Sequence, residues 1–181
     1  GNMADLESIT VLKDLMTAIT SPNIDCRIDG AKIDPENRAG YLFNTGIARI
    51  EQADFILIVG SNPRHEAPLV NARIRKRYLM GGLNVALIGV NENLTYPHTY
   101  LGNNANLLKE ILSGEHAVSE QLKLAKNPMI IVGMGALTRQ DGDLILAHAR
   151  DIADKYNFVR PDWNGFNILH TAASRVGALD L

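Results

Sequence analysis

Two turns in the sequence hold the residue types best suited to contact a small molecule. The first, at residues 60–63, follows five consecutive apolar residues and offers a serine hydroxyl and an asparagine amide. The second, at residues 133–135, contains two glycines after another apolar run. Glycine permits sharp turns and close approach of the backbone to a ligand. These turns predict a dinucleotide-binding crevice whose contacts would come from Gly60, Ser61, Asn62, Pro63, Gly133 and Gly135.

The second turn departs from the dinucleotide fingerprint. That motif requires a third glycine or alanine where this chain has Thr138, because a small residue there lets helix and strand pack closely. A strand end that turns sharply against a helix also selects glycine, without any ligand. We favour close packing as the reason for Gly133 and Gly135, and keep nucleotide binding as the alternative.

A basic cluster follows the first turn and offers a different chemistry. Its members are Arg64, His65, Arg73, Arg75, Lys76 and Arg77. On a helix, residues 73 and 77 share a face whereas 75 and 76 point elsewhere, so the charges form a collar instead of one pocket. We interpret the cluster as a solvated or interface surface. The alternatives are a phosphate group or an acidic protein partner, since arginine is common at interface hot spots.

Other patterns of catalysis and metal binding are missing from the sequence. The five histidines form no H-E-x-x-H or similar ligand spacing. The one cysteine, Cys26, lies in a short predicted strand without an adjacent base, and an iron–sulfur cluster usually needs four thiolates. Neither a Gly-x-Ser-x-Gly elbow nor a phosphate-binding Gly-x-x-x-x-Gly-Lys loop occurs. We therefore expect no catalytic residue and no metal ligand in this chain.

Composition narrows the classes of partner. The 181 residues are 46% hydrophobic, enough for a real core, and carry a formal net charge of −2. That charge gives no electrostatic case for nucleic acid. No apolar run approaches the roughly 20 residues of a membrane span, so direct membrane insertion is not expected. Short flanks outside the first and last predicted helices favour a piece of a longer protein.

Apolar patterning predicts an α/β protein with three layers. Apolar runs predict buried strands at 55–59, 83–89 and 128–135, and alternation predicts a short strand at 24–28. Periodicity and turn signals predict helices at 4–19, 45–52, 68–78, 104–113, 118–125, 141–156 and 166–176, with a frayed end at 178–181. Trp163 is expected to anchor the turn at 161–165.

These elements predict a Rossmann-like fold with a mostly parallel sheet and helices on both faces. We expect one domain over residues 1–181, with two possible strand-helix halves at about 1–115 and 116–181. A β-α-β unit of the length that a right-handed crossover needs lies between the first two buried strands.

The residues also carry a family resemblance. The stretch 53–63, with its Gly-Ser-Asn-Pro turn, resembles the molybdopterin oxidoreductase superfamily. Its continuation, Glu66-Ala-Pro-Leu-Val-Asn-Ala-Arg-Ile-Arg-Lys76, closely resembles the large iron–sulfur subunit of proton-pumping NADH:quinone oxidoreductase, respiratory complex I. Residues 85–89, 94–96 and 167–181 are similar to that subunit too, and the likeness is strongest at 41–105 and from 128 onward.

The resemblance implies a C-terminal, molybdopterin-oxidoreductase-like part of the subunit, acting as a noncatalytic scaffold in the peripheral arm. Iron–sulfur clusters would then lie only on N-terminal sequence outside this chain, which would hold no cofactor. Its partners would be that N-terminal part and other peripheral-arm subunits. Its location would be the cytoplasmic side of a bacterial inner membrane, or the mitochondrial matrix side.

Two alternatives remain open. In the molybdenum enzymes the turn that matches Gly60, Ser61 and Asn62 contacts the pyranopterin guanine dinucleotide, so the chain could keep a working or vestigial nucleotide or pterin site. It could also belong to the central domain of another cofactor enzyme that shares only the Rossmann-like plan.

Overall fold

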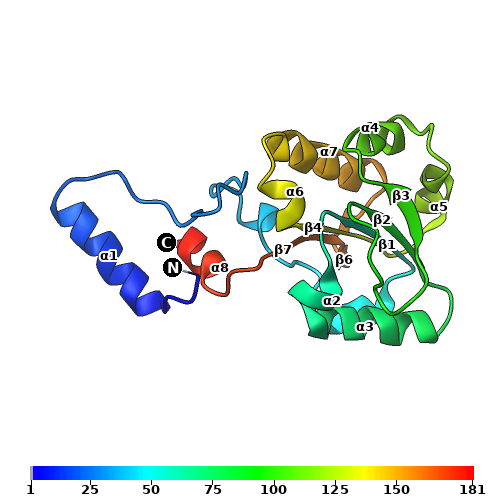
Figure 1. Cartoon of the computed structure of the whole chain (residues 1–181), viewed down its shortest axis with the longest axis horizontal. Helices are drawn as coiled ribbons and strands as arrows, with labels where there is room; N and C mark the ends of the chain where they lie inside the picture. The colour runs from blue at the N-terminus through cyan, green and yellow to red at the C-terminus, as the bar shows by residue number, and fades with distance from the viewer. Residues whose placement is uncertain (1) are drawn as a thin grey trace.

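The computed structural model describes residues 2–181 and centres on a parallel sheet (Figure 1). Its strands are β1 (Phe55–Val59), β2 (Asn84–Ile88), β3 (Thr99–Gly102), β4 (Pro128–Gly133) and β7 (Phe166–Leu169). They lie in the order β3-β2-β1-β4-β7, and each neighbouring pair within the described residues is parallel. This is the order of the first five strands of a Rossmann sheet.

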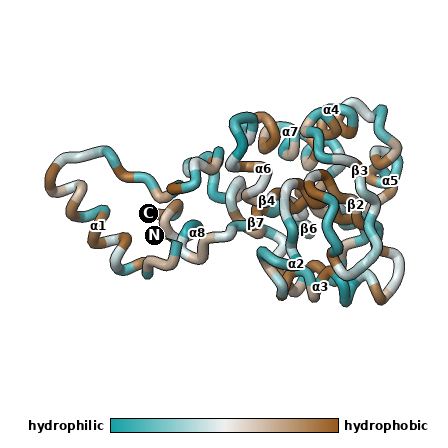
Figure 2. Tube along the Cα trace, in the orientation of Figure 1, coloured by the Kyte–Doolittle hydropathy of each residue, from teal (hydrophilic) through white to brown (hydrophobic). Residues whose placement is uncertain are grey.

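β1 is buried on both faces, which explains its unbroken apolar sequence. Phe55, Leu57 and Val59 belong to one core cluster, whereas Ile56 and Ile58 belong to a second cluster on the opposite face. Successive side chains of a strand point to opposite faces, so both core layers need apolar residues here. Figure 2 shows the same concentration of hydrophobic residues in the central strands.

Helices cover both faces of the sheet (Figure 1). On one face lie η2 (Ala48–Gln52), α2 (Pro63–Glu66) and α3 (Pro68–Leu79). On the other lie α4 (Asn106–Ser113), α5 (Val118–Leu124), α6 (Met134–Leu137) and α7 (Gly142–Lys155). The predicted three-layer Rossmann-like fold is therefore confirmed.

The helix predicted at 166–176 is wrong. Phe166–Leu169 forms β7, which pairs with β4 from Ile130 opposite Phe166, and α8 (Arg175–Asp180) starts only after a turn. Four consecutive buried residues fit a core strand as well as a buried helix turn, so periodicity could not decide between them. The end predicted as frayed is helical to Asp180, whose carboxylate accepts hydrogen bonds from Arg38 and Tyr41.

The strand predicted at 24–28 is also wrong, because these residues are irregular. The Arg27 side chain donates hydrogen bonds to the carboxylate of Asp25, two residues before it, and to the carbonyl oxygen of Ile33. Side-chain hydrogen bonds therefore hold this segment, in place of backbone pairing with another strand. Some elements were not predicted: β3, the 3-10 turn η1 (Arg38–Gly40), and the antiparallel pair β5 (Val159–Arg160) and β6 (Trp163–Asn164). They are too short for a periodic signal.

Trp163 anchors its turn as predicted. It is buried, and its indole Nε1 donates to the carbonyl oxygen of Pro128 at 2.8 Å. At Gly165 a Cβ atom would collide with that same oxygen, so the turn needs glycine to approach β4 closely. The turn therefore fixes the amino end of β4 against the loop that leads into β7.

α1 (Leu6–Ala18) confirms the first predicted helix but lies apart from the sheet (Figure 1). Asp5 caps it by accepting a hydrogen bond from the backbone nitrogen of Ser8. None of the described residues of α1 is buried, so this helix contributes nothing to either core layer.

One buried asparagine on β7 ties the sheet to the segment before η2. The Asn167 side chain accepts from the backbone nitrogen of Thr45 at 2.9 Å and donates to the Thr45 hydroxyl at 2.9 Å. It also donates to the carbonyl oxygens of Gly165 and Ile130. A residue with no exposed surface thus satisfies several backbone groups of three segments.

Replacing Asn167 with leucine should destabilise the fold with little change in volume. The buried groups around Thr45 would lose their partners, at a total cost of at least about 2 kcal/mol. For a chain of this size the melting temperature should fall by roughly 4 to 8 °C, as measured by circular dichroism. Asn23→Leu, at an exposed position, is the control and should melt like the parent. Equal melting of the two variants would contradict the role of Asn167.

Candidate functional site

A crevice opens where β1, β2 and β4 end. It has a volume of about 400 Å³ and is lined by residues of the loops that follow all three strands. The chain leaves β1 toward β2 on one side of the sheet, and β4 lies on the other side of β1. Such a reversal of strand order is the usual ligand position in open α/β sheets.

Four of the six predicted site residues line this crevice. They are Gly60, Ser61, Asn62 and Gly135. Pro63 is instead buried at the first position of α2, and Gly133 is buried at the end of β4 behind Ser61. The structure therefore brings the two predicted turns together, but only part of each faces the open space.

Close packing of the two turns accounts for their glycines. Gly60 has a φ of +60°, and a Cβ atom there would lie 2.5 Å from the backbone nitrogen of Ala136. A Cβ on Gly135 or Gly133 would lie 2.7 or 2.6 Å from the carbonyl oxygen of Gly60. Each contact is shorter than side chains tolerate. The glycines are thus explained by backbone contact, the interpretation favoured from the sequence.

Glu66 is a site residue that none of the predicted motifs includes. Its carboxylate accepts a hydrogen bond from Ser61 Oγ at 2.7 Å and another from the backbone nitrogen of Asn62 at 2.9 Å. The Asn62 side chain in turn caps α2 by accepting from the nitrogen of Arg64 at 3.2 Å. The turn's hydroxyl and a backbone donor are therefore paired within the protein, with a carboxylate where an anionic ligand group would bind.

A sequence signal for Glu66 did exist. In a capping box the residue that begins a helix is followed three positions later by an acid whose side chain returns to its backbone nitrogen. Here the acid comes four positions after Asn62, so it departs from the standard spacing. A four-residue helix closes the same kind of reciprocal contact.

Charged side chains of both signs line the crevice. Glu66 and Glu92 both line it, as does Arg139. The Arg139 guanidinium bonds the carboxylate of Asp141 at 2.7 and 3.0 Å, which raises the pKa of Arg139 and lowers that of Asp141. Its charge is thus already shared with an internal acid.

Much of the predicted basic cluster braces α3. The side chains of Arg73 and Lys76 both donate hydrogen bonds to Glu51 on η2. These hydrogen bonds lower the pKa of Glu51, and the bond from Lys76 has the larger effect. Arg75 donates to the carbonyl oxygen of Thr95, and Arg77 donates to that of Ala53 at 2.6 Å. These cations therefore hold α3 against the neighbouring loops, while contact with an acidic partner stays a prediction.

Cys26, the one cysteine of the sequence, does not line this crevice. Cys26 is partly buried in the irregular segment before Arg27, and desolvation raises the pKa of its thiol. Within residues 2–181 no group of three or more His, Cys, Asp or Glu side chains is placed to hold a metal ion. In the same range, none of the helices combines the length and the apolar character needed to cross a membrane.

Comparison with known proteins identifies the family. The family model described as molybdopterin oxidoreductase matches residues 1–181. The chain belongs to the molybdopterin oxidoreductase family. This assignment confirms the resemblance read from the Gly60 turn and agrees with the Rossmann-like sheet.

Individual relatives of this family member are proteins of NADH oxidoreductases. The chain is 45% identical over its whole length to the G subunit of NADH-quinone oxidoreductase from Rickettsia bellii, and it covers 27% of that protein. It is 44% identical to the mitochondrial NADH dehydrogenase (ubiquinone) iron-sulfur protein 1 of Solanum tuberosum, of which it covers 24%. The predicted likeness to the complex I protein is confirmed. The chain spans about a quarter of the length of these relatives.

Removing the Glu66 carboxylate should destabilise the turn after β1. In a Glu66→Ala variant, Ser61 Oγ and the Asn62 nitrogen lose a charged acceptor. The free energy of unfolding, measured by urea denaturation, should therefore fall by about 1.5 to 3 kcal/mol. Glu92→Ala is the matched control, because Glu92 lines the same crevice. If both variants unfold at the same urea concentration, Glu66 does not hold the turn.

Proposed function

We propose that this chain is a noncatalytic structural part of the large iron–sulfur subunit of an NADH:quinone oxidoreductase. In this role it supports the peripheral arm of the complex during electron transfer from NADH to quinone. Identity of 42 to 45% over all 181 residues to the matching protein of two Rickettsia species supports this placement. The relatives are much longer than this chain, so the activity of the whole subunit is proposed for the complete protein only.

One observation carries the noncatalytic part of the proposal. The Glu66 carboxylate takes the hydrogen bonds of Ser61 Oγ and the Asn62 nitrogen, which are the donors that a phosphate group would need. A second carboxylate, Glu92, lines the same crevice. Bringing a diphosphate against two carboxylates costs free energy unless cations intervene. The residues present therefore do not fit the anionic part of a molybdopterin dinucleotide.

The partners follow from the same placement. We propose contacts with the N-terminal iron–sulfur part of the subunit and with other peripheral-arm subunits. Clusters would be held outside this chain, because its one cysteine, Cys26, cannot supply four thiolates. Residues 1–181 would act as one structural domain on the cytoplasmic side of a bacterial inner membrane or the matrix side of a mitochondrial one.

A second candidate is a retained or vestigial nucleotide or pterin site. The observation that favours it is the position of the crevice at the reversal of strand order, where ligands of such sheets bind. Its volume of about 400 Å³ is within the range of small-molecule pockets. Under this alternative Asn62 would bind the ligand, in addition to capping α2.

A thermal-shift titration separates the two candidates. The chain should show no stabilisation with GMP, GDP, NADH or a molybdopterin dinucleotide preparation. A ligand at 100 times its dissociation constant would add about 2.7 kcal/mol and raise the midpoint by several degrees. Such a shift, lost in Asn62→Leu and kept in the exposed Asn23→Leu control, would favour the second candidate over the first.

The structural role also makes a prediction for the assembled complex. With Ser61→Ala in the complete subunit, NADH:quinone activity per assembled complex should equal that of the parent, because the Ser61 hydroxyl is engaged by Glu66. The yield of complex measures assembly, and the rate per complex measures catalysis. A rate reduced about tenfold or more per complex would mean that the crevice takes part in turnover.

A further inference from the structure

The apolar side of α1 is uncovered in this chain. Val11, Leu12, Leu15 and Ile19 are 48 to 68% exposed, an unusual state for four large apolar side chains. At 100° per residue these four positions fall within about 100° of the helix circumference. We refer to them as the α1 apolar face. In Figure 2 hydrophobic segments recur along α1, far from the sheet.

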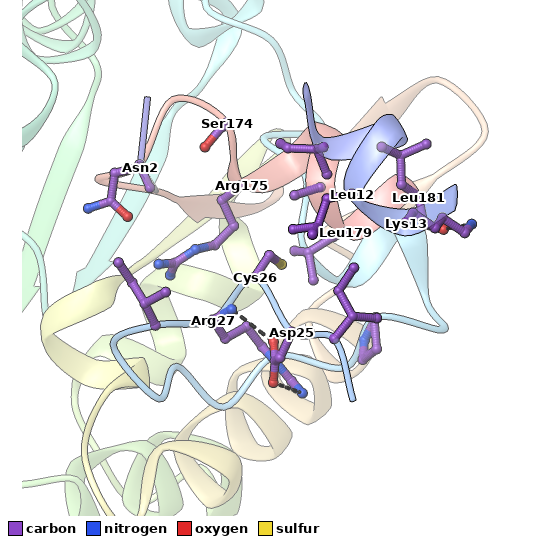
Figure 3. Close-up of a pocket in the computed structure, with 16 residues that line it drawn as sticks. Asn2, Leu12, Lys13, Asp25, Cys26, Arg27, Ser174, Arg175, Leu179 and Leu181 are labelled. Carbon is purple, nitrogen blue, oxygen red and sulfur yellow. Dashed lines mark hydrogen bonds and ion pairs between the residues drawn. The ribbon is translucent and has the colours of Figure 1, made fainter. Parts of the chain in front are cut away.

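A groove continues this face toward α8. It has a volume of about 300 Å³ and runs between α1, residues 24–28 and α8 (Figure 3). Leu12, Leu179 and Leu181 lie together on one side of it, with Cys26 opposite them. Across the groove the paired side chains of Asp25 and Arg27 form a polar rim, and Arg27 lowers the pKa of Asp25 to about 2.

α1 has few contacts of its own to hold it. The Leu6 side chain touches α8 near Gly177, and Lys13 donates to the backbone oxygen of Leu181. A helix of 13 residues is marginal in water without packing on its apolar side. The α1 apolar face therefore needs a cover that the described residues do not provide.

The two ends of the described chain lie beside this groove. Asn2 and Leu181 both line it, and the carbonyl oxygen of Asn2 accepts from the nitrogen of Ser174 at 3.3 Å. In relatives the matching region is only 24 to 27% of the protein. Whichever end carries additional residues, they leave beside the groove, whose lining includes Leu12 of the α1 apolar face. Attached residues also have a high effective concentration there.

We propose that residues flanking this sequence in a longer polypeptide pack on the α1 apolar face and place an apolar side chain in the groove beside Cys26. α8, whose Val176 and Leu179 pack against the first core cluster, then joins α1 and sequence outside residues 1–181 to the sheet domain. The inference rests on the proposed function, which places the chain in a longer subunit. It names the surface through which the chain joins the rest of that subunit.

The test compares the 181-residue chain with the complete subunit that carries it. Hydrogen exchange read by mass spectrometry should show α1 amides exchanging on the order of 100-fold more slowly in the complete subunit, because opening α1 would then expose a packed core. Alkylation of Cys26 by iodoacetamide, followed on its own peptide, should slow by about tenfold or more. Neither readout requires a mutation.

A pair of variants locates the contact. In the complete subunit Leu15→Lys should return α1 exchange to the rate seen in the 181-residue chain, since it places a charge in the buried face. Asp14→Lys, outside the α1 apolar face, should leave exchange unchanged. Both variants should keep the protection of β1 amides, which reports the sheet separately.

Equal exchange of α1 in the two proteins would overturn the inference. So would protection in the 181-residue chain that rises with its concentration, because a second copy would then cover the face. Either result leaves the crevice titration untouched, so this inference can fail while the proposed function stands. Ligand binding at Asn62 together with a protected α1 would be the reverse: the inference would hold while the proposed function failed.

Discussion

The central constraint in this protein is that β1 must be buried on both faces. Its five apolar residues pair with β2 on one side and β4 on the other, and neither face can be left to water. Helices must therefore cover both sides of the sheet, which produces the three layers. The same placement leaves the carboxyl end of β1 as the floor of the crevice, between the loops that follow β2 and β4.

At the carboxyl end of β1 the protein itself supplies an anionic group, the Glu66 carboxylate. A strand end followed by a helix start presents backbone donors, and in many nucleotide-binding proteins a phosphate accepts from them. Here Glu66 accepts from Ser61 Oγ and the Asn62 nitrogen. A family fold associated with cofactor binding is thus compatible with a turn whose donors are already satisfied. Fold and function have to be argued separately for this reason.

The sequence was informative where the physics is local or repetitive. Apolar runs locate β1, β2 and β4, and Gly60 identifies a turn that lines the crevice. β7 was mistaken for a helix because only its long-range pairing with β4 distinguishes a short buried strand. Glu66 was missed because its role depends on a side chain folding back across a four-residue helix. The exposure of α1 was likewise outside the reach of periodicity, which reports amphipathicity without reporting what covers it.

The parallel arrangement of the sheet also bears on how the chain folds. Phe55 pairs with Asn84 and with Pro128, so β1 has no neighbour that a tight hairpin could bring to it. Each pairing closes a crossover of dozens of residues. The chain loses the conformational entropy of that crossover before any hydrogen bond between the strands can form. Contacts of this kind make folding slow and leave apolar strands exposed for longer. The residues that make β1 the centre of the finished sheet are therefore also those most prone to wrong association before the sheet is complete.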